Sequence, residues 1–220
     1  MLVDHRDPWR AVSRLAIPDS LGFLADQLLA IADTIAIGSL GTAALAAVSG
    51  AFTVWFLVIM AVSGFRSGLL IVGAQRIGAG DTAGFGDAVR AATLTPVIAA
   101  LCAGVLSLVL GDSILHALVG PLPTLHEGVV YFQLRVFSIA IGAITFMIGA
   151  GLTAAGNSTT NLRALVIMNL VHIPLLLVLA LGWWTHHPFG IVGAGVSSLL
   201  SEVAGAAYVV WYVARRPGYM

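Results

Sequence analysis

The stretch LGFLADQLLAIADTIAIGSLGTAALAAVSG (residues 21–50) decides the fold, because it is apolar enough to cross a bilayer and yet carries two carboxylates. Asp26 and Asp33 are seven residues apart, and at about 100° per residue this spacing places them on nearly the same face of a helix. A charged side chain at the centre of a bilayer costs at least about 2.5–3.5 kcal/mol. We therefore expect the two acids to face water, a partner or a substrate, and not lipid.

The composition is that of an integral membrane protein. The 220 residues have a mean hydropathy of +1.01, and only 9% of them are charged, against about 25% in a soluble domain. Ten basic residues, all of them arginine, balance ten acidic ones, so the net charge indicates no class of partner. The single Cys102 lies in an apolar run, where we expect a small hydrophobic residue.

Six segments are long enough to span a membrane, which takes about 20 apolar residues. We expect helices at residues 15–38, 46–75, 88–110, 129–154, 162–184 and 190–213. The breaks between them are short and contain glycine, proline or polar residues, so consecutive helices should be antiparallel. The sequence thus predicts an all-α membrane protein with one six-helix bundle over 15–213, an N-terminal segment 1–14 and a C-terminal tail 214–220.

The positions of the arginines predict the orientation. Eight of the ten lie on the side that both termini share: Arg6, Arg10, Arg14, Arg76, Arg90, Arg163, Arg215 and Arg216. The opposite loops hold no arginine, only Asp112, Glu127 and most of the histidines. By the positive-inside rule, both termini should be cytoplasmic in a multi-pass protein of the plasma (inner) membrane. Two copies that dimerise should therefore insert the same way up.

Ionisable groups from four different spans fall near the predicted midplane. Counted at about 1.5 Å per residue from an arginine at the cytoplasmic side, four groups lie about 14–20 Å deep in a core of about 30 Å: Asp26, Arg66, His172 and Glu202. Asp33 is higher, about 28 Å from Arg14, and no arginine matches its depth. This pattern is typical of an ion or substrate pathway.

Purely structural roles would also explain these residues. Asp26 and Arg66 have matched depths and would satisfy each other in a static ion pair. His172 would bridge two helices through a hydrogen bond, with Asn169 three residues earlier on the same face. Glu202 follows a run of serines and would hold two helices together or contact a second chain.

The remaining polar and helix-breaking residues carry weaker signals. Arg135 lies near the outer end of its span, where we expect it to snorkel to the interface. Pro18 and Pro174 are potential hinges within their helices. His186 and His187 have no further ligand nearby, so we expect no metal site. No nucleophile–base or phosphate-binding motif is present, so we do not expect an enzyme.

Four blocks of sequence resemble the multidrug and toxic compound extrusion (MATE) family. They are ADTIAIGSLGTAALAAVSG (32–50), VGAQRIGAGD (72–81), LTAAGNSTTNLRALVIMNLVHIPLLL (152–177) and GIVGAGVSSLLSE (190–202). They follow the family's order over nearly the whole chain and match the N-terminal half of a transporter that has twelve helices. The resemblance implies that the six helices form one lobe of a two-lobe transporter, and that a homodimer would rebuild the whole.

The resemblance also implies roles for single residues. Asp33 matches the family's acid in the first helix, which is tied to ion coupling, and Pro18 matches a proline at which that helix bends. The fifth helix of the family often carries Asn or Asp at a spacing of four, and here those positions are His172 and Leu176. This departure favours H⁺ over Na⁺, because histidine titrates near neutral pH. Arg66 and Glu202 do not belong to the family motif.

Together these observations predict a secondary antiporter that exports amphipathic, cationic compounds such as drugs in exchange for H⁺ or Na⁺. Asp33 would couple to the ion, with Asp26 as its helper. The expected partners are the bilayer, a second copy of the chain and small organic substrates, with no nucleic acid and no cofactor besides the ion. Three alternatives remain: a lipid-linked oligosaccharide flippase of the same superfamily, a non-transporting module that assembles with a partner subunit, and a fragment of a longer protein.

Overall fold

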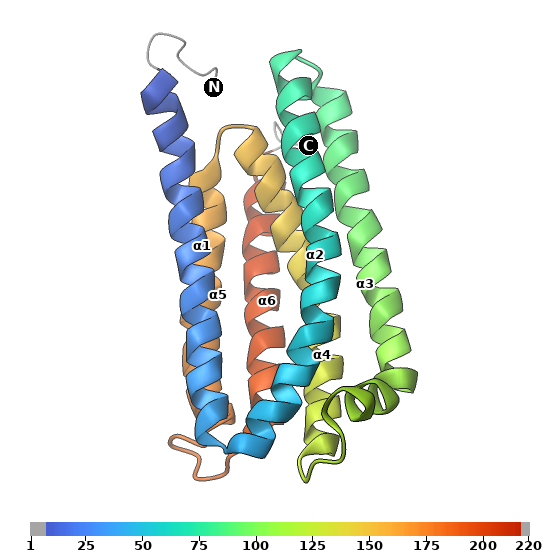
Figure 1. The fold of residues 1–220 in the computed structure, drawn as a ribbon. Coiled ribbons are helices and arrows are strands. Elements are labelled where there is room, and N and C mark those ends of the chain that lie inside the picture. The colour runs from blue at the N-terminus through green and yellow to red at the C-terminus, as the bar shows by residue number, and fades with distance from the viewer. Residues whose placement is uncertain (1–7, 217–220) are drawn as a thin grey trace.

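The computed structural model describes residues 8–216, and these form six α-helices (Figure 1). The helices are α1 (Pro8–Ser39), α2 (Thr42–Gly78), α3 (Thr82–Val119), α4 (Leu125–Ala154), α5 (Ser158–Leu179) and α6 (Gly190–Ala214). All six are long and apolar enough to cross a membrane. The predicted all-α membrane fold with six spanning helices is therefore confirmed.

Several helix ends differ from the prediction: α1 begins at Pro8 instead of 15, α3 at Thr82 instead of 88, and α4 at Leu125 instead of 129, so Glu127 belongs to a helix. α3 continues to Val119 instead of ending at 110, so Asp112 belongs to a helix and not to a loop. α5 ends at Leu179 instead of 184, because Gly182 and Trp184 have φ angles of 72° and 70°, which a right-handed helix does not contain. Residues 1–7 and 217–220 of the two predicted terminal segments lie outside the described residues, and residues 8–14 form the first turns of α1.

The turn between α2 and α3 is built by the glycine-rich stretch that follows the predicted second span. Gly80 has a φ of 73°, a left-handed conformation that suits glycine. Asp81 then caps α3: its Oδ1 accepts a hydrogen bond of 2.8 Å from the Gly84 amide, and its Oδ2 one of 2.6 Å from Arg76. These two interactions, the amide bond first, lower the pKa of Asp81 below its usual value.

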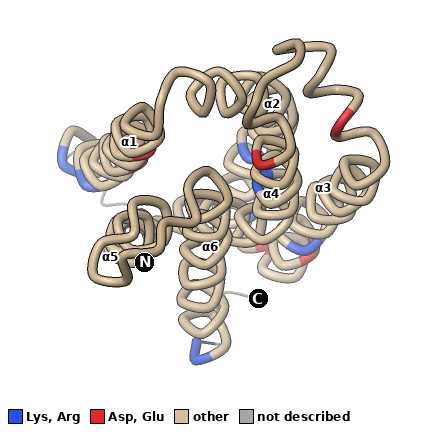
Figure 2. The backbone as a smooth tube through the Cα atoms, turned by 90° about the horizontal axis from the view of Figure 1, so that it is seen from below, with Lys and Arg blue, Asp and Glu red and all other residues tan. Residues whose placement is uncertain are grey.

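α4 and α6 form a central pair, with α2 and α3 packed on one side of it and α1 and α5 on the other. α4 packs against α2, α3 and α6, while α5 packs against α6 and α1. α1 makes its main contact with α5 and little with α2, although the two are consecutive. Seen from the end opposite the termini, α1 and α5 lie to one side of α6, and α2, α3 and α4 lie to the other (Figure 2). This arrangement leaves much of α1 and α2 without a packing partner within the described residues.

Small residues allow close packing on α6 but not at Gly64 and Gly68 of α2, whose small-xxx-small spacing is typical of close helix contacts. A Cβ atom at Gly193 would lie 2.4 Å from the carbonyl oxygen of Leu179, and one at Gly205 would lie 2.6 Å from the Met168 side chain. At Gly64 and Gly68 a Cβ atom would meet nothing within 4 Å. These two glycines instead line an open groove between α2 and α3.

Candidate functional site

Side chains from three helices meet around His172. Oδ1 of Asp33, on α1, lies 2.7 Å from Nε2 of the His172 ring, on α5. On the opposite side of the ring, Oγ of Ser201, on α6, lies 3.4 Å from Nδ1. The His172 side chain is fully buried, with 0% exposed, and that of Asp33 is 14% exposed. We call Asp33, His172 and Ser201 the Asp–His–Ser cluster.

Apolar packing one turn away sets the geometry of this cluster. Ile37 and Leu176 follow Asp33 and His172 by four residues, are each 1% exposed and belong to one core cluster. Residues four apart share a helix face, so the contact that buries Ile37 and Leu176 also turns Asp33 toward His172. The prediction that Asp33 stands apart from the midplane group is therefore wrong.

The hydrogen bonds of the cluster can rearrange as it holds or releases a proton. Ser201 Oγ donates a 2.8 Å hydrogen bond to the Ser198 carbonyl, which leaves its lone pairs for an Nδ1–H of His172. In that tautomer, one proton is shared between Nε2 and the Asp33 carboxylate. When that proton leaves and the ring shifts to the tautomer that donates from Nε2, Nδ1 can accept from the Ser201 hydroxyl, which then gives up its bond to the Ser198 carbonyl. The serine thus serves either tautomer.

Arg66 pairs with Asp19, and not with Asp26 as predicted. Its Nη2 lies 3.1 Å from Oδ1 of Asp19. The prediction failed because Arg14 and Arg76 do not lie at the same level: Asp19 is about 7.5 Å from the first along α1, and Arg66 about 15 Å from the second along α2. Figure 1 shows the α2–α3 turn standing beyond the connection between α4 and α5.

Asp19 is a site residue that sequence reasoning missed, although a signal was present. The seven-residue spacing of Asp26 and Asp33 extends back to Asp19, and a helix turns by only about 20° per seven residues from a perfect repeat. The three acids form one line along α1, which we call the acidic stripe. Its members are about 10.5 Å apart along the axis, and its two ends pair with Arg66 of α2 and His172 of α5.

The middle of the acidic stripe belongs to a second charged group. The Arg135 guanidinium stacks over the Trp55 ring, 4.7 Å from its centroid, and interacts electrostatically with both Asp26 and Glu202. The prediction that Arg135 reaches the outer interface is therefore wrong. The Trp55 ring holds the cation between the helices, with the two carboxylates in electrostatic range.

Glu202 lies directly against the backbone of α4. A Cβ atom at Gly142 would be 2.8 Å from Oε2 of Glu202, so this glycine makes room for the carboxylate. The neighbouring hydroxyls of Ser197, Ser198 and Ser201 each donate to a carbonyl within α6. Within residues 8–216, no three His, Cys, Asp or Glu side chains form a group that would hold a metal ion.

Asn169 does not contact His172. Its amide donates a 2.9 Å hydrogen bond to the Leu165 carbonyl within α5, so the expectation that it partners the histidine is wrong. A primary amide four residues from a carbonyl on the same helix satisfies itself locally. The ring of His172 bonds to α1 and α6 instead.

Pro18 has a structural counterpart on α5. A proline has no amide hydrogen, so the carbonyl of Arg14, four residues earlier, receives no hydrogen bond from position 18. The Ser158 hydroxyl, at the first residue of α5, lies 3.5 Å from that carbonyl oxygen. Both α1 and α5 remain continuous helices through Pro18 and Pro174. Ser158 and Arg14 therefore mark a common level on the two helices.

These features define a polytopic membrane protein with titratable and charged groups between its spanning helices. The MatE family model matches residues 18–178, and the chain belongs to this family of MATE proteins. Its six helices correspond to one half of a MATE transporter, which confirms the family and the half-transporter fold that the sequence predicts.

Two curated relatives and one solved structure illustrate the match. The chain is 26% identical over 213 residues to the probable multidrug resistance protein YoeA of Bacillus subtilis, covering 94% of this chain and 45% of the relative. It is 25% identical to the probable multidrug resistance protein NorM of Rhizobium meliloti, covering 99% of this chain and 47% of the relative. A MOP-superfamily transporter from Pyrococcus furiosus superposes with a TM-score of 0.85 at 25% identity, covering 94% of this chain and 45% of that one. The chain spans about half the length of these relatives.

Proposed function

We propose that this chain is one lobe of a proton-coupled antiporter that exports amphipathic cations across the plasma membrane. Two copies, inserted the same way up with cytoplasmic termini, would supply the two lobes and enclose a central cavity. The observation that carries the proposal is the Asp–His–Ser cluster, a protonatable group held between three helices. The names of the relatives, probable multidrug resistance proteins, support the substrate class.

Protons suit this site better than sodium ions. Asp33 is occupied by a direct 2.7 Å contact with the imidazole of His172. A sodium ion takes oxygen ligands, so it would have to displace the ring from the carboxylate, and His172 would then lose its partner on α1. A proton needs no such displacement. Its arrival or departure changes only the tautomer of the ring and the role of Ser201.

The charge of the interior favours a cationic substrate over an anionic one. Four carboxylates lie along α1 and α6, namely Asp19, Asp26, Asp33 and Glu202, against the two guanidinium groups of Arg66 and Arg135. An organic cation entering between the helices would meet an excess of negative charge. A lipid-linked pyrophosphate, the substrate of the alternative flippase, would be repelled. In this proposal Asp26, Arg66, Asn169 and Glu202 line the substrate path.

The hinge of the transport cycle is assigned to α1. Pro18 has no amide hydrogen to donate to the Arg14 carbonyl, and the Ser158 hydroxyl lies 3.5 Å from that carbonyl oxygen. α1 makes its main contact with α5 alone, so a bend at Pro18 disturbs few neighbours. A change in the protonation of the cluster near the other end of α1 would alter the contact of α1 with α5 and permit this bend. Pro174, two residues after His172, is placed to transmit it to α5.

Transport by the purified chain in proteoliposomes tests the proposal. An inside-acid pH gradient should drive uptake of a fluorescent organic cation, with proton efflux recorded in parallel. D33N should reduce both by more than tenfold, and H172N should reduce both. D112N, which removes an exposed carboxylate of α3, is the matched control and should leave both unchanged. Unaltered exchange by D33N would overturn the proposed coupling.

The two-lobe assembly has a separate test. Native mass spectrometry of the purified chain should give a dimer. Cysteines placed on the exposed faces of α1 and α2 should cross-link between copies, and the cross-link should block dye uptake. A chain that is strictly monomeric and still exchanges dye for protons would contradict the homodimer.

A further inference from the structure

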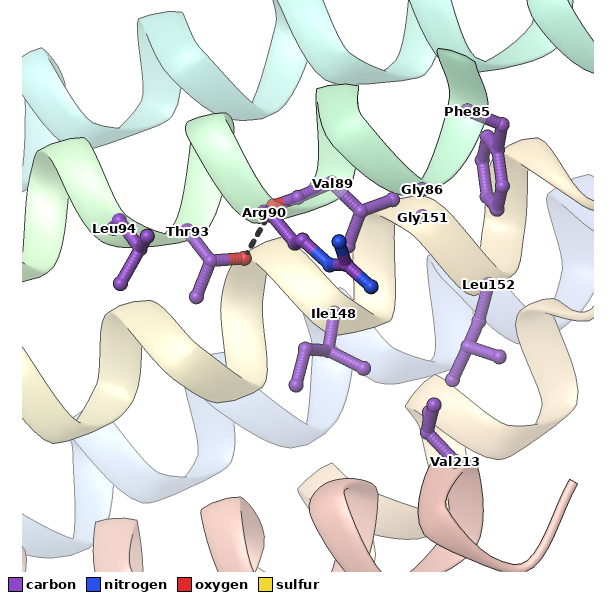
Figure 3. A pocket seen from close by; sticks show the side chains of 10 residues that line it. All are labelled: Phe85, Gly86, Val89, Arg90, Thr93, Leu94, Ile148, Gly151, Leu152 and Val213. Atoms are coloured by element: carbon purple, nitrogen blue, oxygen red, sulfur yellow. Dashed lines mark hydrogen bonds between the residues drawn. The ribbon is translucent and has the colours of Figure 1, made fainter. Parts of the chain in front are cut away.

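A groove of which α4 is the floor lies outside the Asp–His–Ser cluster, near the termini (Figure 3). The floor is formed by Ile148, Gly151 and Leu152 of α4. One wall is α3, from Phe85 to Leu94, and the other is Val213 of α6. α3 and α6 both pack on α4. The cavity volume is about 220 Å³.

The groove takes an apolar ligand with one polar end. Arg90 and Thr93 are the polar side chains in its lining, and the Thr93 hydroxyl already donates a 2.7 Å hydrogen bond to the Val89 carbonyl (Figure 3). The Arg90 side chain extends from α3 across the groove toward Ile148 in the same view. A volume of 220 Å³ is below the roughly 300–1,000 Å³ of sites that enclose a drug-sized molecule. It suits a stretch of hydrocarbon chain.

The end of the groove nearest the chain termini lies at the membrane surface. Phe85 lies in the first turn of α3, Leu152 in the last turn of α4 and Val213 in the last turn of α6. Leu94, further along the groove, is 59% exposed on a helix apolar enough to span the bilayer. The groove therefore runs from the interface into the hydrocarbon layer, where acyl chains are the neighbours.

Positive charge gathers at the polar end. Arg215 and Arg216 directly follow the α6 wall, each stacked on an aromatic ring of its own helix, at 4.9 Å from Trp211 and 4.4 Å from Tyr212. Asp87 lies 3.8 Å from Arg90, but their side chains are 79% and 67% exposed, so this pair is weak and readily exchanged. Basic pockets between spanning helices at the headgroup level bind anionic lipid headgroups.

We propose that this groove binds one anionic phospholipid of the leaflet at the terminal end of the bundle. Arg90 contacts the phosphate, and an acyl chain lies along Ile148 and Leu94, toward the hydrocarbon layer. This site lies on the far side of α4 from Asp19 and Arg66, and it is independent of the proposed antiport. A bound lipid would join α3 to α6, two helices that are otherwise linked through α4.

Native mass spectrometry tests the site, with phosphatidylglycerol and phosphatidylcholine offered at equal concentration to the purified chain. The wild type should retain one phosphatidylglycerol in preference to phosphatidylcholine. R90Q should lower this preference about fivefold, since one basic residue near the surface contributes about that factor. R90K should keep most of it. I148F, which fills the floor of the groove, should weaken the retention of both lipids.

R163Q is the matched control, because Arg163 is an exposed arginine at the same end that does not line the groove. Equal losses in R163Q and R90Q would show a diffuse surface attraction and overturn the site. Equal binding of the two lipids by the wild type would overturn it as well. Glycerol phosphate, which has no acyl chains, should fail to compete. Effective competition would show that the apolar groove is not used.

Discussion

Arg66 forms its ion pair with Asp19, at 3.1 Å, and not with Asp26, seven residues further along the same face of α1. D19N should therefore lower the unfolding stability in detergent, while D26N should leave the Arg66 contact intact. The side chains are 22% and 42% exposed, so we expect a loss below about 1 kcal/mol. The charge swap D19R/R66D should recover most of the stability that either single reversal loses. Recovery by D26R/R66D instead would contradict the assignment.

The contact between Asp33 and His172 should be measurable as a coupling energy. A double-mutant cycle with D33N and H172N, followed by unfolding in a denaturing detergent, should give about 0.6–1.7 kcal/mol, the range found for polar contacts between membrane helices. The same cycle between D33N and N169A is the control, because Asn169 bonds within its own helix. Additive effects in the first cycle would show that the 2.7 Å contact is not formed.

Pro18 and Ser158 should be coupled through the carbonyl of Arg14. S158A should destabilise the wild type by about 0.5–1.5 kcal/mol, since it removes one hydrogen bond to a carbonyl that has no helical donor. In a P18A background the new amide donates to this carbonyl, and S158A should then cost less. Thermal unfolding of the four proteins in detergent gives the comparison. Equal costs in the two backgrounds would mean that Ser158 does not serve the proline site.

Two glycines of α6 should respond differently to the same change. In G193A the new Cβ would lie 2.4 Å from the Leu179 carbonyl oxygen, a backbone atom that cannot move aside. We expect a loss of about 1–3 kcal/mol. In G205A it would meet the Met168 side chain at 2.6 Å, and a methionine can turn away, so the change should stay below about 1 kcal/mol. Thermal unfolding monitored by aggregation or fluorescence ranks the two variants. A reversed order would contradict the packing.

Asp81 should contribute a pH-dependent part of the stability. Its pKa is lowered in the folded chain by the Gly84 amide and by Arg76. The contribution is therefore present above the unfolded pKa of about 3.9, and it is lost as the pH falls through the lower folded pKa. D81N should melt below the wild type at pH 7, and the two melting temperatures should converge near pH 3. A constant difference across this range would contradict the assigned cause.

Hydropathy alone was enough to predict the six helices, and the family motif was enough to single out Asp33. Neither could predict which charged side chains pair with each other. Which helices touch, and at what level, depends on how far each helix extends beyond the bilayer. Arg76 and Arg14 stand at different levels, so depths counted from them misplaced the partner of Arg66. The same error separated Asp33 from His172: Arg163 lies five residues inside α5, whereas Ser158 is the residue level with Arg14.

The sequence predicted only in part which face of its helix each functional side chain occupies. The seven-residue spacing aligned Asp26 with Asp33 and would have found Asp19 as well. No comparable repeat predicts that Ser201 contacts His172 or that Trp55 contacts Arg135, because both contacts depend on side chains from other helices. No sequence pattern marks Gly142 either, because its role is to leave room for the Glu202 carboxylate on α6.

The full burial of His172 has a kinetic consequence. Solvent touches the Asp33 side chain, 14% exposed, but not the imidazole behind it, at 0%. Protons of the imidazole can therefore exchange with water only through the Asp33 carboxylate, which is the one solvent-accessible group of the pair. Replacing Asp33 should slow exchange at the His172 ring nitrogens by NMR even where the imidazole stays in place. In the proposed proton coupling, the carboxylate would then receive the proton first, and the ring second.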